Sequence, residues 1–115
     1  FVLDLIHSAK GIAVMAHPVM FNNTELLLEL IEAGKLDGIE AYHHSATPTQ
    51  QQKLADIAKE HDLIVTGGSD FHGLYNETMT HIGSMTTDKE NLDKLFKLIH
   101  INSQKANKAA VKTEK

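Results

Sequence analysis

The sequence contains no cysteine, no tryptophan and no arginine, and these absences exclude several classes of protein. Without cysteine there is no disulfide scaffold and no zinc finger built on thiolates, and the chain suits a reducing compartment. Without arginine, no guanidinium can hold a phosphate through two parallel hydrogen bonds. No apolar run approaches the roughly 18 residues that a membrane span needs, and Phe1 does not open a signal peptide. We therefore expect a cytoplasmic protein with no membrane partner.

The residues that are present are ordinary for a globular domain, apart from the histidines. The chain has 115 residues, 42% hydrophobic and 23% charged, with eight histidines. Residues 1–100 hold seven lysines against fourteen acids, whereas residues 101–115 hold four lysines against one acid. The acidic body argues against an extended nucleic-acid surface. We expect one domain over residues 1–100, followed by a lysine-rich, frayed tail over residues 101–115.

Apolar residues alternate along the chain between helical spacing and strand-like runs. Helical faces lie within residues 2–9, 26–31, 54–58 and 92–99, and strands are expected at 12–16, 38–42 and 63–66, with a short fourth at 81–85. The segments 47–50 and 87–90 have the pattern of a capping box, which marks a helix start. Helices alternating with strands are typical of an α/β protein with a parallel sheet.

Histidines and an aspartate follow the expected strands. His17 comes after the first strand, His43 and His44 after the second, and Asp70 and His72 after the third. Functional groups of parallel α/β proteins collect at the carboxyl ends of the strands, so we expect these side chains on one face. Imidazole and carboxylate ligands without a thiolate suit Zn²⁺, Mn²⁺ or Fe²⁺.

His17, Asp70 and His72 are the candidate metal ligands. Asp70 and His72 are two residues apart, so an extended backbone would point both to one side, and Pro18 should hold His17 extended as well. Three protein ligands with open positions are typical of a catalytic ion and not of a structural one. The alternatives are a turn or cap around Asp70 and a hydrogen-bonded structural role for His17 at its strand end.

Glu40, His43 and His44 are weaker candidates in the same region. Glu40 lies in the second strand and either orients a ligand histidine or is a structural acid, with direct metal ligation less favoured. His43 and His44 either bind phosphate or move a proton in a cleft, or they lie in a solvated loop. A structural role near helix ends is favoured for three other histidines: His7, His61 and His100.

Three motifs, in their order and spacing, resemble the C-terminal half of the PHP (polymerase and histidinol phosphatase) family of metal-dependent phosphoesterases. They lie at residues 11–18, 36–43 and 66–73, and the last contains Gly-Ser-Asp-Phe-His-Gly. The resemblance implies parallel βα units that form the C-terminal half of a distorted (βα)7 TIM-like barrel. It also implies two or three divalent ions, held in part by His17, Asp70 and His72, and a metal-activated hydroxide that attacks phosphorus.

The resemblance implies a phosphoesterase that hydrolyses phosphomonoesters or nucleotide and oligonucleotide phosphates, with histidinol-phosphatase-type or polymerase-associated activity as alternatives. The family's His-x-His pair belongs to an N-terminal half that is missing here. We therefore expect the intact parent to be the enzyme and this fragment to be inactive or weakly active. An alternative from another class is a non-catalytic module that forms an oligomer through exposed sheet edges. A third is a metal-dependent hydrolase barrel that acts on C–N bonds.

Overall fold

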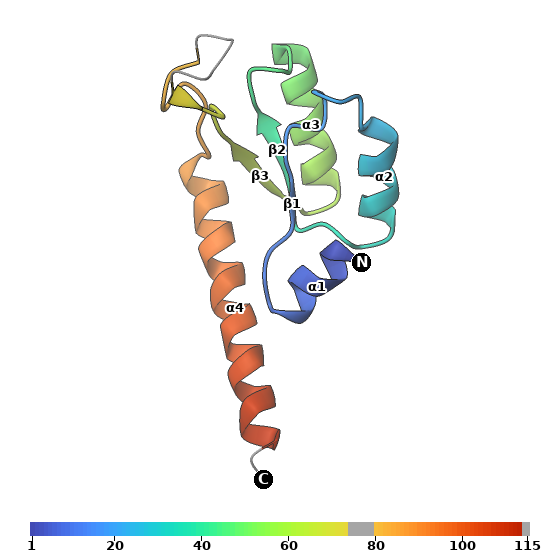
Figure 1. Cartoon of the computed structure of the whole chain (residues 1–115), viewed down its shortest axis with the longest axis vertical. Coiled ribbons are helices and arrows are strands. Elements are labelled where there is room, and N and C mark those ends of the chain that lie inside the picture. The colour runs from blue at the N-terminus through green and yellow to red at the C-terminus, as the bar shows by residue number, and fades with distance from the viewer. Residues whose placement is uncertain (74–79, 114–115) are drawn as a thin grey trace.

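The computed structural model describes residues 1–73 and 80–113, and within these ranges the chain alternates helices with parallel strands (Figure 1). The elements are α1 (Val2–Ser8), β1 (Val14–Met15), α2 (Thr24–Glu32), β2 (Gly38–Tyr42), α3 (Pro48–Glu60), β3 (Ile64–Gly67) and α4 (Lys89–Thr113). The strands form one parallel sheet in the order β1-β2-β3. The α/β class with parallel strands is thus confirmed, while closure into a TIM-like barrel stays a prediction.

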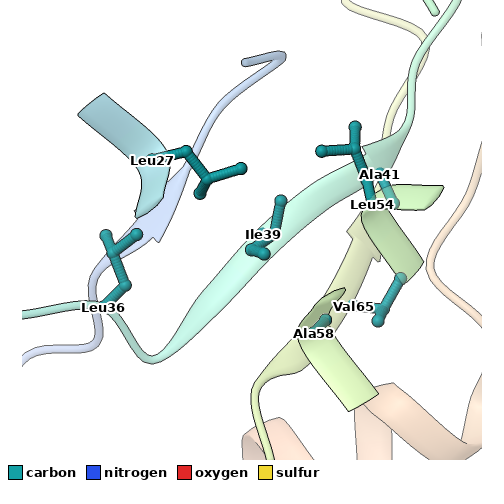
Figure 2. Packing of buried hydrophobic residues seen from close by; sticks show 7 residues of the cluster. All are labelled: Leu27, Leu36, Ile39, Ala41, Leu54, Ala58 and Val65. Atoms are coloured by element: carbon teal, nitrogen blue, oxygen red, sulfur yellow. The ribbon is translucent and has the colours of Figure 1, made fainter. Parts of the chain in front are cut away.

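The hydrophobic core lies between the sheet and the two crossover helices, α2 and α3. Leu27 of α2 is fully buried, as is Ala58 of α3, and both belong to one cluster with Ile39 of β2 and Val65 of β3. Figure 2 shows these side chains meeting across the helix–sheet interface. Because the three strands are parallel, their carboxyl ends come together at one edge of the sheet.

The capping box predicted at the start of α3 is confirmed. The Thr47 hydroxyl accepts the Gln50 N–H at 3.2 Å, and the Gln50 side chain accepts the Thr47 N–H at 2.8 Å. At α4 the prediction was wrong by one residue, because Asp88 and not Thr87 caps the helix, accepting the Asn91 N–H at 2.8 Å. Thr87 and Asp88 are both residue types that can serve as an N-cap, and the hydrogen bond between Thr87 and Gly67 of β3 leaves Asp88 as the cap.

The residues around the start of α4 cover the free edge of β3. Asn91 Oδ1 accepts the Val65 N–H at 2.9 Å, and Thr87 Oγ1 accepts the Gly67 N–H at 3.1 Å. These side chains supply hydrogen bonds that a neighbouring strand would otherwise make. The fourth strand predicted at residues 81–85 is wrong: the segment forms a turn and bends, and Gly83 has a φ of +79°.

The α4 helix is longer than the sequence pattern predicted. It continues to Thr113, through most of the segment expected to be a frayed tail, because residues 101–113 have no glycine or proline and are rich in alanine and lysine. Its expected apolar face is largely solvent-exposed, with Phe96 59% exposed. Asn91 and Asn102 lie on the less exposed side of α4. The Asn102 side-chain amide donates a hydrogen bond to the Lys10 carbonyl at 3.3 Å. Among the described helices, none combines the length and the mean hydropathy that a membrane span requires.

Removing the α4 cap should destabilise the chain in a pH-dependent way. Asp88→Ala is expected to lower the free energy of unfolding by about 1 kcal/mol at neutral pH, because it leaves a helix N–H without its acceptor. The hydrogen bond from the Asn91 N–H lowers the pKa of the Asp88 carboxyl. The carboxylate therefore adds stability above its unfolded-state pKa, and this is lost as the pH falls through the lower folded-state pKa. Urea unfolding across the acid range measures both effects.

Asp88→Asn is the matched control, because asparagine also caps helices but does not titrate. It should keep most of the stability at neutral pH and lose the part of the acid dependence that Asp88 supplies. If Asp88→Asn unfolds with the same acid dependence as the wild type, the pKa shift of Asp88 makes no contribution to stability.

Candidate functional site

The carboxyl ends of the three strands bring His17, His43 and Asp70 together. Asp70 Oδ2 lies 3.3 Å from His43 Nε2 and 3.9 Å from His17 Nε2. The ring centroids of His17 and His43 are 5.0 Å apart. Each of these residues follows a different strand, so the parallel sheet is what places them side by side.

His17 and Asp70 both have a left-handed backbone, with φ of +25° and +53°. Our expectation of an extended backbone at these residues was therefore wrong. In this conformation the His17 N–H donates to Glu40 Oε1 at 2.9 Å. A left-handed conformation costs a non-glycine residue roughly 1–2 kcal/mol, and such strain clusters at functional sites.

Glu40 joins the ends of β1 and β3. Its Oε1 holds the His17 backbone, and its Oε2 lies close to Gly68, where an added Cβ would come within 3.2 Å of that oxygen. Glu40 therefore contacts the backbone of one candidate ligand and lies near the loop that leads to Asp70. Glu40 thus has a structural contact with the His17 backbone, and a role in orienting a ligand histidine stays a prediction.

His43 is buried, with a side chain only 1% exposed, so it does not lie in a solvated loop. Its Nδ1 accepts the Ser45 N–H at 3.1 Å, and the Ser45 hydroxyl lies 2.7 Å from the same nitrogen. The Gln51 amide of α3 donates to the carbonyls of His43 and Ala46, at 3.3 and 3.1 Å. His44 is exposed, and its ring centroid lies 4.2 Å from that of His43.

His72 is the most loosely held of the three candidate metal ligands. Its side chain is 60% exposed, and its Nδ1 lies 3.6 Å from Asp70 Oδ1 and hydrogen bonds to the Asp70 carbonyl. The Asp70 and His72 side chains therefore lie close together, although the backbone at Asp70 is not extended. The His72 side chain that approaches Asp70 is mostly exposed, whereas that of His43 is buried.

The described residues fit a divalent ion only in part. Imidazole and carboxylate donors suit such an ion, and His17 Nδ1 is buried without a hydrogen-bond partner in the described part of the chain. However, no group of three or more His, Cys, Asp or Glu side chains in residues 1–73 and 80–113 is placed to hold a metal ion. A metal site that includes His17 and Asp70 would therefore need ligands from other residues.

Ser45 and Gln51 are contacts of the site that the sequence pattern did not predict. The only available signal was a serine two residues after a histidine, a spacing at which local side-chain to backbone bonds are common. Among the histidines given a structural role, His7 hydrogen bonds to Asp37 at 2.8 Å and His61 is the C-cap of α3. His100 is not near a helix end, because α4 continues beyond it.

Comparisons with known proteins add independent information. No protein-family model matches the chain. Over 73 residues, 64% of its length, the chain is 40% identical to the phosphoribosyl 1,2-cyclic phosphate 1,2-diphosphodiesterase of Eggerthella lenta. Over 74 residues it is 42% identical to a 5'-3' exoribonuclease of Haemophilus influenzae. The chain spans only 27% of each of these relatives.

A solved structure is similar over a larger part of the chain. The crystal structure of a candidate metal-dependent phosphoesterase from Bifidobacterium adolescentis matches with a TM-score of 0.71 and 33% identity. The match covers 84% of this chain and 35% of that one. All three of these similar proteins are named for the hydrolysis of phosphate esters. The resemblance of this chain to the PHP family of metal-dependent phosphoesterases is thus confirmed over the aligned part of its sequence.

Proposed function

We propose that this chain supplies the C-terminal ligands of a divalent-metal-dependent phosphoesterase that hydrolyses phosphomonoesters or nucleotide and oligonucleotide phosphates. The observation that carries the proposal is the convergence of His17, His43 and Asp70 at the ends of three strands. Similarity to a cyclic phosphate diphosphodiesterase and to an exoribonuclease supports the substrate class. The relatives extend well beyond the matched region, and we propose that the remaining ligands come from the N-terminal half of the same barrel.

Four of the candidate residues have a role in this proposal. His17 and Asp70, with His72, bind the ion, and Glu40 keeps the His17 backbone in its left-handed conformation. A bound Mn²⁺, Zn²⁺ or Fe²⁺ would neutralise the phosphoryl oxygens and activate water. The chain has a formal net charge of −4 and no arginine, so a bound ion would supply positive charge that the acidic chain lacks overall. The absence of cysteine agrees with a cytoplasmic location for such an enzyme.

A chimera tests this proposal. The part of the Eggerthella lenta relative that precedes the matched region would be joined to this chain, and hydrolysis of p-nitrophenyl phosphate and bis(p-nitrophenyl) phosphate measured with added Mn²⁺. We expect hydrolysis of at least one ester, and its loss when EDTA removes the ion. The isolated chain should be inactive or weakly active, because its described residues do not complete a metal site.

The other outcomes each contradict the proposal in a recognisable way. A folded chimera that hydrolyses neither ester with Mn²⁺, Zn²⁺ or Fe²⁺ would overturn it. An isolated chain that forms a stable, metal-independent oligomer, together with an inactive chimera, would support a non-catalytic interaction module. Turnover of an amide but not of either ester would support a hydrolase acting on C–N bonds.

A further inference from the structure

We infer that His43 is a positioning residue that orients the Asp70 carboxylate by donating a hydrogen bond from Nε2. This inference rests on the proposed function, in which Asp70 is a metal ligand. It assigns to His43 neither of the functional roles that its sequence position suggested, phosphate binding and proton transfer.

The hydrogen-bond partners of His43 define which nitrogen carries the proton. The Ser45 backbone N–H can only donate, so His43 Nδ1, 3.1 Å away, must accept and carries no hydrogen. The one ring proton then lies on Nε2. Asp70 Oδ2, 3.3 Å from Nε2, is the acceptor that this proton faces.

The position of the ring is fixed from several sides. The side chain is 1% exposed, so no water competes freely for either nitrogen. The backbone carbonyl of His43 accepts both the Gln51 amide of α3, at 3.3 Å, and the Ala46 N–H, at 3.1 Å. A donor held this rigidly loses little entropy when it binds a carboxylate, so it can select one orientation of the Asp70 side chain.

This arrangement divides the two oxygens of Asp70 between different partners. Oδ2 faces His43, whereas Oδ1 faces the more exposed His72, at 3.6 Å from its Nδ1. Ligating carboxylates in proteins are commonly hydrogen bonded by a further residue, which fixes the direction of their free lone pairs. Both nitrogens of His43 are occupied, so the ring has no free group to bind a phosphate.

The tautomer of His43 can be measured directly on the isolated, metal-free chain. Long-range ¹H–¹⁵N correlation spectra of the ¹⁵N-labelled chain near neutral pH should show His43 with an unprotonated Nδ1 and a protonated Nε2. A spectrum in which Nδ1 carries the proton would overturn the inference, because Nε2 could then not donate to Asp70.

Variants of His43 in the chimera test the effect on metal binding by titration calorimetry with Mn²⁺. His43→Ala should weaken binding by about 10–100-fold, the usual cost of losing a partner that orients a ligand. His43→Gln places an amide N–H near the original Nε2 and should restore most of the affinity. His43→Asn is the matched control, because its shorter amide does not reach Asp70. Exposed His61→Ala should bind like the wild type.

The pattern of the variants separates positioning from simple packing. Equal affinities of His43→Gln and His43→Asn, or wild-type affinity in His43→Ala, would overturn the inference while leaving the proposed function intact. Circular dichroism identifies any variant that has not folded, and the Gln and Asn pair retains a polar group of similar size at the buried position. A wild-type chimera that binds no Mn²⁺ would contradict the proposed function itself. In that case the tautomer of His43, measured on the isolated chain, still tests the hydrogen bond from His43 to Asp70.

Discussion

Replacing Asp70 with asparagine is expected to weaken Mn²⁺ binding and ester hydrolysis by the chimera more than any other single change proposed for the site. The loss should exceed the roughly 10–100-fold that removal of an orienting partner costs, because the substitution removes the negative charge of the carboxylate that lies beside His17 and His43. Asparagine tolerates a left-handed backbone, so the loop at φ +53° should keep its conformation. Titration calorimetry and initial rates measure the two effects.

Asp62→Asn provides a matched control for this prediction. Asp62 has the same φ of +53°, is exposed, and follows the C-cap of α3. The substitution changes the net charge of the chain by the same amount, yet we expect wild-type metal affinity and rate. Equal losses in Asp62→Asn and Asp70→Asn would show that net charge, and not ligation by Asp70, controls binding, and would contradict the assignment.

Leu27→Ala is expected to lower the free energy of unfolding of the chain by about 2–5 kcal/mol. Leu27 is fully buried between α2 and the sheet, in a cluster with Leu36 and Ile39, so its loss leaves a cavity (Figure 2). Small domains are stable by only about 5–15 kcal/mol in total, so this one change removes a large share. Urea unfolding at constant pH measures the loss.

The neighbouring Leu28→Ala is the control, since it makes the same chemical change in the same helix. Leu28 is 42% exposed, and its replacement should cost no more than about 0.5–1 kcal/mol. Similar losses for the two variants would contradict the packing of α2 shown here, because burial is the main difference between them.

The sequence determined the features that depend on nearby residues. The strand β2 matches its predicted bounds, Gly38 to Tyr42, because a short segment with Ile39 and Tyr42 lies between turn-forming residues. The start of α3 was predictable because both partners of its capping box lie within one turn of helix. The location of His17, His43 and Asp70 at the carboxyl edge followed from the alternation of helices and strands.

Contacts between distant residues decided the rest. Asp88 caps α4 in place of Thr87 because Thr87 binds Gly67 of β3. His17 adopts a left-handed backbone while its N–H donates to Glu40 of the next strand.

Only the tertiary structure could distinguish between two roles for His43, positioning of Asp70 and binding of phosphate. Its neighbours in sequence supply one partner, Ser45, but its burial and the Asp70 carboxylate come from other elements of the fold. The sequence by itself determined the class of fold, the edge at which the site lies and the residue types that gather there. The direction of each side chain was decided by tertiary contacts, because hydrogen bonds between elements select one conformation among several that local sequence permits with similar energy.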